Sequence, residues 1–300
     1  MSTSNIRDEK QRPQPHAAQS RSVSIVGCGW VGLAAGRALT QQGYPVRGST
    51  TRSSRRSMLT EAGIEPFVTT FSPEPEPAVP ELFSSDVLIC TLPPGRSNAN
   101  ATPYADQIAV LMAQAQAHGI ERVIYTSSTG VYPPTEGPVT EEAVDPRTPH
   151  GAAAPRRSTA EAVRSAEQIV VTAYPERAVI LRLGGLFGPE RHPGRFIAGR
   201  TDVKRPQSPV NMVHQQDVVG VIQAVVEREA VQGVFNVVAP EHPTRRAFYE
   251  AAVRDYGGAP PTFADDTSTE GKRVVSTKLM DTLGYVFAYP DPTAPFRREE

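Results

Sequence analysis

The sequence predicts an α/β fold in which a parallel, doubly wound sheet is followed by a smaller C-terminal subdomain. From Ser22 onward, short runs rich in Val and Ile alternate with longer stretches that have helical periodicity. This alternation is typical of β-α units that feed parallel strands. After Phe187 the alternation weakens. We therefore expect a larger core at 21–185 and a smaller part at 186–300 that is interleaved with the core.

Five strands are predicted from short apolar segments. Each is rich in Val or Ile and ends near Gly, Pro or Ser, which terminate strands. They lie at 23–26, 45–49, 86–92, 122–126 and 178–183. Since β-α units place successive strands in one sheet, we expect the carboxyl ends of these strands to share one edge.

Two helices are predicted from apolar residues that recur at i, i+3, i+4 and i+7. The helix at 105–117 has a stripe made of Ile108, Leu111, Met112 and Ala115. The helix that begins near His214 has a stripe made of Val218, Val221, Ile222 and Val225. Both stripes are expected to lie on the sheet.

The remaining segments are polar or rich in proline. Residues 1–20 have hardly an aliphatic side chain, so we expect a disordered tail. The proline-rich segments at 73–80, 133–155 and 189–209 are predicted to be loops. The last two are expected to border an active cleft.

The composition argues against several classes of partner. The formal net charge is −1 and no dense basic run occurs, which argues against nucleic acid. No apolar stretch approaches the roughly 20 residues of a membrane helix, and no signal peptide is recognisable, so we expect no membrane partner and a cytoplasmic protein. Cys28 and Cys90 lie in apolar sequence without nearby His, which predicts reduced thiols and no metal site.

A glycine-rich motif follows the first predicted strand. Its residues Gly27, Gly29, Trp30, Val31 and Gly32 stand between a Val/Ile strand and a helix rich in Ala and Leu, the context of the Rossmann dinucleotide fingerprint. The first glycine permits the tight turn, the second lets a pyrophosphate approach, and the third lets helix and strand pack closely. The motif predicts an NAD(P) site, so we expect the core at 21–185 to bind the nucleotide and the smaller part at 186–300 to bind the substrate.

The end of the second strand bears on the choice between NADP and NAD. An NAD site has an acidic residue there, but this chain continues through Ser49 and Thr50 to Thr51 and Arg52. Hydroxyls and Arg52 can bind the 2′-phosphate of NADP, which we therefore prefer; a solvated arginine is the alternative. From strand order, Leu92 and Pro93 are expected over a cofactor ribose.

The strand at 122–126 runs into a hydroxyl cluster, Ser127-Ser-Thr-Gly-Val-Tyr132, and open α/β sheets bind ligands at such strand ends. Here the sequence resembles the extended short-chain dehydrogenase/reductase superfamily, which includes NAD(P)-dependent sugar epimerases and dehydratases. The resemblance runs from Val23 onward and is strongest to atypical, epimerase/dehydratase-like members. Further matching segments begin at Leu181, Val213, Val234 and Lys278, and a Gly-Pro-x-Arg-His-Pro-Gly-Arg-Phe segment covers 188–196.

The resemblance implies that Ser128 takes the place of the superfamily's carbonyl-polarising Ser or Thr. The superfamily's Tyr-x-x-x-Lys pair, in which the lysine lowers the tyrosine pKa, is absent. In one register its positions hold Thr159 and Val163, and in another they hold Ala153 and Arg157. Neither register supplies a group that titrates near neutrality.

An acid or base would then have to come from elsewhere. By motif, the candidates are Tyr132, His192 and His214, although each also suits a packing, surface or capping role. Arg191 and Arg195 flank a loop that can hold a phosphate or carboxylate of a substrate. We expect Ser128, His192 and Tyr132 as catalytic candidates and the two arginines with His214 as substrate-binding candidates.

Two functions follow as hypotheses. The first is an NAD(P)-dependent oxidoreductase or epimerase-like enzyme that acts on a hydroxyl or carbonyl of a polar small-molecule metabolite, for example a sugar nucleotide. The second is a catalytically silent NAD(P)-binding regulatory or redox-sensing protein, which the missing Tyr/Lys pair favours. A β-hydroxyacid dehydrogenase, suggested by the glycines and Thr91-Leu-Pro-Pro94, is weaker because it leaves 127–132 unexplained. A monomer or homodimer is expected.

Overall fold

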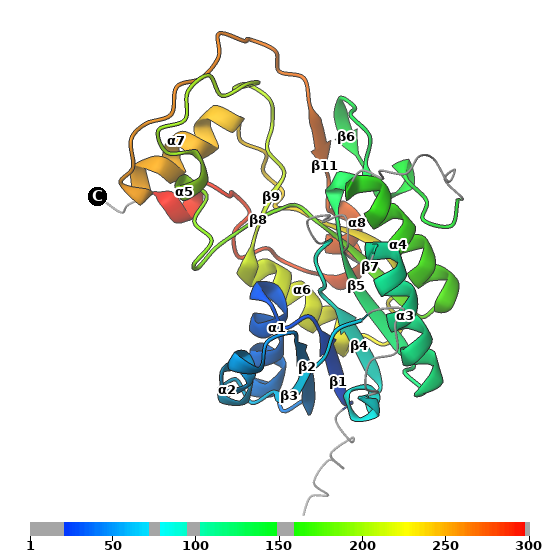
Figure 1. Ribbon diagram of the computed structural model, residues 1–300. Helices are drawn as coiled ribbons and strands as arrows, with labels where there is room; N and C mark the ends of the chain where they lie inside the picture. The colour runs from blue at the N-terminus through cyan, green and yellow to red at the C-terminus, as the bar shows by residue number, and fades with distance from the viewer. Residues whose placement is uncertain (1–20, 72–78, 95–102, 149–158, 298–300) are drawn as a thin grey trace, which may run out of the picture.

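Seven parallel strands form the central sheet of the computed structural model, which describes residues 21–71, 79–94, 103–148 and 159–297 (Figure 1). Across the sheet the order is β3-β2-β1-β4-β5-β7-β10. Every neighbouring pair is parallel. This is the doubly wound order of a Rossmann fold, and the predicted fold class is confirmed.

All five predicted strands are present in the sheet. β1 (Val23–Val26) and β7 (Ala178–Leu183) have the predicted bounds. The other three are β2 (Val46–Thr50), β4 (Val87–Cys90) and β5 (Arg122–Ser128), whose bounds differ from the prediction by at most two residues at either end. Strand ends depend on hydrogen bonds to neighbouring strands, which a single segment does not reveal.

Two strands of the sheet were not predicted. β3 (Glu65–Val68) is short, half-exposed and contains Pro66, which is tolerated because the strand lies at the sheet edge. β10 (Gly233–Val237) is a five-residue buried run at the opposite edge. Periodicity alone does not distinguish such a run from a helix segment.

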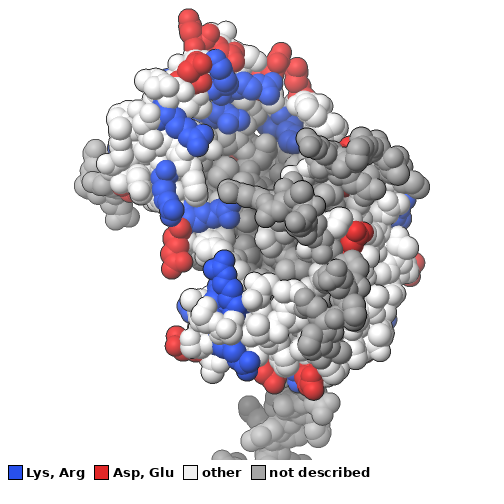
Figure 2. All heavy atoms as spheres, viewed as in Figure 1, with Lys and Arg blue, Asp and Glu red and all other residues white. Residues whose placement is uncertain are grey.

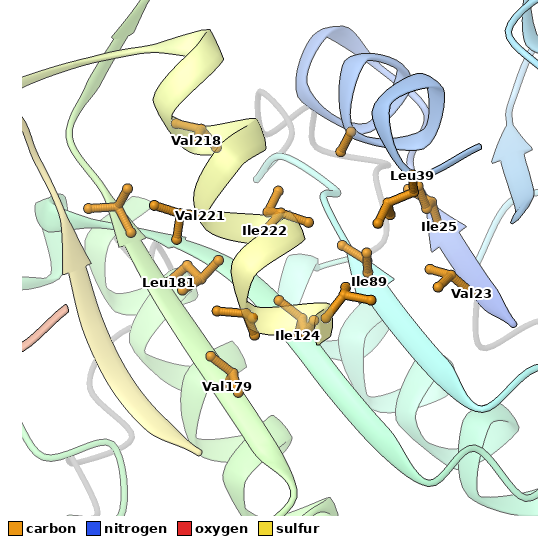
Figure 3. Packing of buried hydrophobic residues seen from close by; sticks show 14 of the residues in the cluster. Val23, Ile25, Leu39, Ile89, Ile124, Val179, Leu181, Val218, Val221 and Ile222 are labelled. Carbon is orange, nitrogen blue, oxygen red and sulfur yellow. The ribbon is translucent and has the colours of Figure 1, made fainter. Parts of the chain in front are cut away.

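Helices cover both faces of the sheet. α1 (Trp30–Gln41) and α6 (Gln215–Glu227) lie on one face, and α3 (Tyr104–Ala117) and α4 (Thr159–Ala173) lie on the other. Alternate residues of the strands feed two apolar clusters, one on each face. Figure 3 shows the cluster under α1 and α6, where Leu39 and Ile222 meet Ile25, Ile89 and Ile124. The predicted apolar stripe of α6 is buried in this cluster, and the predicted stripe of α3 is buried in the cluster on the opposite face.

A smaller part lies over the carboxyl edge of the sheet (Figure 1). It contains β8 (Gly185–Phe187) paired with β9 (Met212–His214), α5 (Gly194–Ile197) and α7 (Arg245–Tyr256). Its own apolar cluster consists of Phe187, Val210, Phe248, Ala252 and Phe296. Between β9 and this cluster's last residues, α6 and β10 return to the central sheet, so the smaller part is discontinuous in sequence.

Three further elements complete the description. β6 (Gly137–Val139) pairs with β11 (Lys272–Val274) beside the carboxyl end of β5, and α8 (Thr277–Leu283) follows. α2 (Arg56–Glu61) connects β2 to β3. The predicted tail at 1–20 and parts of the first two proline-rich segments lie outside the described residues. Within the described ranges, no helix has the length and apolar character needed to cross a bilayer.

A buried ion pair joins β7 to α4. Arg182 and Glu167 are both fully buried, and the guanidinium donates to the two carboxylate oxygens at 2.7 and 3.0 Å. Arg182 also donates to the carbonyl oxygens of Glu141 and Val144, and Ser127 Oγ donates to the carboxylate at 2.5 Å. Because every charged atom has partners, the pair ties the end of β5 to α4 and β7.

Removing one member of this pair should destabilise the protein strongly. We expect Glu167→Ala to lower the free energy of unfolding by about 3–5 kcal/mol, because it leaves the Arg182 charge buried without a counter-charge. Glu61→Ala, at an exposed position of α2, should change it by less than about 0.5 kcal/mol. Urea unfolding of the two variants measures the difference, and equal small effects would show that the pair is not a structural constraint.

Candidate functional site

The glycine-rich turn lies between β1 and α1, beside the strand ends where the order of the sheet reverses. Gly27 has φ +94°, and its N–H donates to Ser49 Oγ at 3.0 Å. Its carbonyl oxygen accepts from Thr91 Oγ1 at 2.6 Å. A Cβ here would lie 3.1 Å from the backbone of Thr91 and Leu92. The turn is therefore fixed between β2 and β4, and its backbone favours glycine.

The other two glycines of the motif differ in the space around them. A Cβ at Gly32 would lie 2.5 Å from the carbonyl oxygen of Gly27 and 2.6 Å from Thr91 Oγ1, so helix and strand pack too closely for a side chain. A Cβ at Gly29 would have only the Gly27 carbonyl oxygen near it, at 3.8 Å. Gly32 therefore serves internal packing, whereas Gly29 leaves open space over the start of α1.

Donors without acceptors face this space. The backbone N–H groups of Trp30, Val31 and Gly32 have no acceptor among the residues that the structure describes. The N-cap Gly29 offers no side-chain oxygen, and the first turn of α1 contains no acidic residue. A helix N-terminus with free N–H groups attracts an anion. These donors fit the pyrophosphate of a dinucleotide.

The end of β2 contains two residues whose hydroxyls accept hydrogen bonds inside the protein and two residues that are exposed. Ser49 and Thr50 are buried, and their hydroxyls accept from the N–H groups of Gly27 and Arg52, so they are used inside the turn. Thr51 and Arg52 are exposed. Neither Arg52 nor Arg55 has a carboxylate partner in the described part of the chain, and Arg55 Nε is buried without a hydrogen-bond partner. Positive charge without a counter-charge therefore remains here.

Other residues frame the same turn. Leu92 packs against Gly27, and its carbonyl oxygen accepts from the Tyr104 hydroxyl at 2.9 Å, while Pro93 is exposed. Cys28 is a free, buried cysteine, and burial raises the pKa of its thiol to about 12. Cys90 is likewise free, and burial raises its pKa to about 12. Both thiols are therefore packing groups.

At the carboxyl end of β5, two adjacent serines face opposite ways. Ser127 is buried against Glu167, whereas Ser128 is exposed. The Ser128 Oγ accepts from the N–H of Gly130 at 3.0 Å, which leaves its own O–H free to donate. The Ser128 hydroxyl is therefore held in one orientation and is exposed at the carboxyl end of β5, where α/β proteins bind ligands.

Tyr132 lies inside the protein. Its hydroxyl donates to Asn236 Oδ1 at 2.7 Å and accepts from Arg182 at 3.0 Å. Burial raises the pKa of this hydroxyl despite the positive charge of Arg182 beside it. Since its hydrogen bonds are used within the core, the geometry gives Tyr132 the packing role that was the alternative to catalysis.

Lys272 reaches this site from β11 and was not singled out from the sequence. Its Nζ donates to the carbonyl oxygens of Thr129 and Tyr132, each at 3.0 Å. Partial burial lowers the pKa of the ammonium group. Lys272 and Thr129 are 143 residues apart in the chain, and no local motif signals this contact. The lysine fixes the turn that follows Ser128.

The described positions for the missing Tyr/Lys pair hold no substitute. Thr159 is exposed at the start of α4, and Val163 is buried in the apolar cluster of that face. Ala153 and Arg157, the second register, lie outside the described residues. The described residues also contain no group of three or more His, Cys, Asp or Glu side chains suited to a metal ion.

His192 lies in the smaller part. Its Nδ1 accepts from the N–H of Gly194 at 3.1 Å, so the neutral ring carries its proton on Nε2, which faces Asp255 Oδ2 at 3.1 Å. The ring stacks on Tyr256 and contacts Phe296. Both nitrogens are thus engaged in the packing of α5 against α7.

His214 caps α6. Its Nδ1 accepts from the N–H of Gln216 at 3.2 Å, and its ring packs on Tyr289 and Phe187. Burial lowers the pKa of the imidazole, although Asp217 opposes the shift. A neutral, buried cap matches the alternative that the sequence left open for this residue.

The two loop arginines lie in different environments. The guanidinium of Arg191 lies 5.6 Å from the centre of the Trp30 ring, next to the glycine-rich turn. The guanidinium of Arg195 lies 5.9 Å from the ring of its neighbour Phe196. Figure 2 shows Lys and Arg side chains on both sides of the gap between the smaller part and the sheet-bearing part.

Comparisons with known proteins agree with this geometry. The family model described as NAD dependent epimerase/dehydratase matches residues 23–237. Protein YeeZ of Escherichia coli (strain K12) is 34% identical over 279 residues, which cover 91% of this chain and 97% of that protein.

Solved structures show the same fold. A functionally unknown conserved protein from Silicibacter pomeroyi has a TM-score of 0.68 and 24% identity over 92% of this chain and 97% of that chain. The UDP-glucuronic acid 4-epimerase from Bacillus cereus, in complex with NAD, has a TM-score of 0.72 and 15% identity over 92% of this chain and 94% of that chain. The resemblance inferred from the motifs is confirmed, and the chain belongs to the NAD dependent epimerase/dehydratase family.

Proposed function

We propose that this protein binds NAD(P) at the turn formed by residues 27–32 and acts as an oxidoreductase or epimerase-like enzyme on a hydroxyl or carbonyl of a polar metabolite. The observation that carries the proposal is the set of free N–H donors at the start of α1 beneath the open position of Gly29. A sugar nucleotide is the substrate class we favour, because the Bacillus cereus relative in fold is a UDP-glucuronic acid 4-epimerase.

NADP is the cofactor we propose over NAD. Arg52 and Arg55 follow β2, where the ribose of a dinucleotide lies in this fold, and neither is neutralised by a described carboxylate. No acidic residue is present at the strand end to bind the 2′-hydroxyl. A guanidinium can bind two phosphate oxygens at once, which favours the 2′-phosphate.

Ser128 is the residue we assign to the reacting oxygen. When bound, the nicotinamide supplies a hydride donor or acceptor. The Ser128 hydroxyl is oriented by the Gly130 N–H and can donate a hydrogen bond to a substrate oxygen, which polarises the carbon–oxygen bond. Lys272 stabilises the turn behind it by binding two backbone carbonyl oxygens.

A second candidate function is a silent NAD(P)-binding regulatory protein. The observation that favours it is the buried Val163 in α4, together with the internal hydrogen bonds of Tyr132, His192 and His214. These groups leave no activated proton donor beside Ser128 in the described part of the chain. Turnover of any carbonyl or sugar nucleotide, followed by absorbance of the reduced nicotinamide, would favour the enzyme, whereas binding without turnover would favour the regulator.

Substituting Gly29 tests the cofactor site. We expect Gly29→Val to abolish NAD(P) binding in calorimetry, because its side chain fills the space over the free N–H groups. A Cβ at this position meets nothing closer than 3.8 Å, so the fold should persist, and thermal melting checks this. Unchanged affinity in a folded variant would contradict the assignment of the turn.

Reversing the charge at Arg52 tests the preference for NADP. We expect Arg52→Glu to weaken NADP binding by about 10- to 100-fold and NAD binding by far less, because only NADP carries the 2′-phosphate. Arg37→Glu makes the same charge change at an exposed position of α1 and serves as the control. Equal losses for both cofactors in Arg52→Glu would remove this residue from the phosphate site.

Removing the Ser128 hydroxyl tests the chemical role. Once a substrate is found, Ser128→Ala should lower kcat by about 10²-fold and leave the affinity for NAD(P) unchanged. The exposed Ser57→Ala, in α2, is a matched control that should retain full activity. A Ser128→Ala variant with wild-type kcat would show that the oxygen is polarised by another group.

A further inference from the structure

We propose that Arg191 is a cofactor-binding residue whose guanidinium contacts the pyrophosphate of the dinucleotide, so that a loop of the smaller part completes the site built by α1. The sequence placed Arg191 with the substrate; the geometry points to the cofactor instead. This inference rests on the proposed binding of NAD(P) at residues 27–32.

Trp30 is the platform that places Arg191. It is the first residue of α1, directly after Gly29, and the Arg191 guanidinium lies 5.6 Å from its ring centre. The Trp30 Nε1–H donates to the carbonyl oxygen of Pro189 at 2.8 Å, which attaches the loop to the helix. The cation therefore lies on the side chain of the first residue of α1, the helix whose first N–H groups lack acceptors.

The loop is held in this place from two further sides. The N–H of Arg191 donates to the carbonyl oxygen of Gly188 at 3.0 Å, closing a tight turn. The side chain of Gln215, at the start of α6, donates to the carbonyl oxygen of Trp30 at 2.8 Å. The backbone on both sides of the contact is therefore fixed, which keeps the Arg191 side chain next to Trp30.

The charges around Arg191 favour the binding of an anion. Arg191 is exposed and forms no ion pair with any described carboxylate, and its sequence neighbour Glu190 forms none either. The start of α1 adds the positive end of a helix dipole, and its first turn has no acidic residue. Two positive features at one place repel each other, and a bound pyrophosphate would relieve that repulsion.

The chemistry of the group fits the pyrophosphate better than a single carboxylate. A guanidinium presents several N–H donors in a plane and binds two oxygens at once, while the backbone N–H groups of α1 approach from the other side. Arg195 lies in the same loop segment but over Phe196, without a link to Trp30. It provides a matched control within the loop.

The test compares Arg191→Met with Arg195→Met by calorimetric titration of the full chain. The probes are NAD and NADP, then ADP-ribose, which keeps the pyrophosphate but lacks nicotinamide, and adenosine, which lacks phosphate. Trp30 is the only tryptophan in the sequence, so its fluorescence reports independently on ligands at this turn in the wild-type protein. Thermal melting confirms that the variants are folded, and Arg191→Gln serves as a second variant.

We expect Arg191→Met and Arg191→Gln to weaken NAD and ADP-ribose binding by about tenfold or more, with adenosine unaffected and Arg195→Met like the wild type. Wild-type affinity for NAD and ADP-ribose in both Arg191 variants would overturn the inference and leave the proposed function standing. An equal loss in Arg195→Met would also overturn it, since general positive charge would then explain the effect. Failure of the wild-type chain to bind NAD, NADP or ADP-ribose would overturn the proposed function and this inference together.

Discussion

The buried ion pair between Arg182 and Glu167 is the constraint on which the arrangement at the carboxyl end of β5 depends. Two buried charges are stable only when each is fully paired. The ion pair therefore holds α4 in a fixed position relative to β7. Ser127 donates to the same carboxylate, and because successive side chains of a strand point to opposite faces, Ser128 points the other way and is exposed. The hydroxyl of Tyr132 is drawn into the same network through Arg182. One buried network thus joins β5, α4 and β7 beside Ser128.

The two ends of the site differ in how completely they are built. At the glycine-rich turn, Gly27, Gly29 and Gly32 each have a separate geometric reason, and the start of α1 keeps donors free. At the end of β5, one oriented serine is exposed, and Tyr132, His192 and His214 use their hydrogen bonds for capping or packing. Lys272 stabilises the turn but binds backbone carbonyl oxygens. Among the described residues, the geometry therefore gives more support to the proposed dinucleotide site than to a proton transfer.

The sequence predicted the features that depend on local pattern. The glycine-rich turn, β1 and β7 follow from residue type and spacing, and the parallel, doubly wound sheet follows from the alternation of strands and helices. The contacts made across long stretches of chain were not accessible in this way. The internal use of the Ser49 hydroxyl, the approach of Lys272 to Thr129 and the placement of Arg191 on Trp30 all depend on tertiary packing. For His192 and His214, the sequence left capping open as an alternative, and only the hydrogen-bond geometry distinguishes it from exposure in the cleft.

The central claim, that the start of α1 holds a dinucleotide, is tested most directly by a crystal structure of the protein grown with NADP. The account predicts the pyrophosphate within hydrogen-bond distance of the N–H groups of Trp30, Val31 and Gly32, over the position of Gly29. A dinucleotide bound elsewhere, or an empty turn at a saturating concentration of NADP, would contradict it.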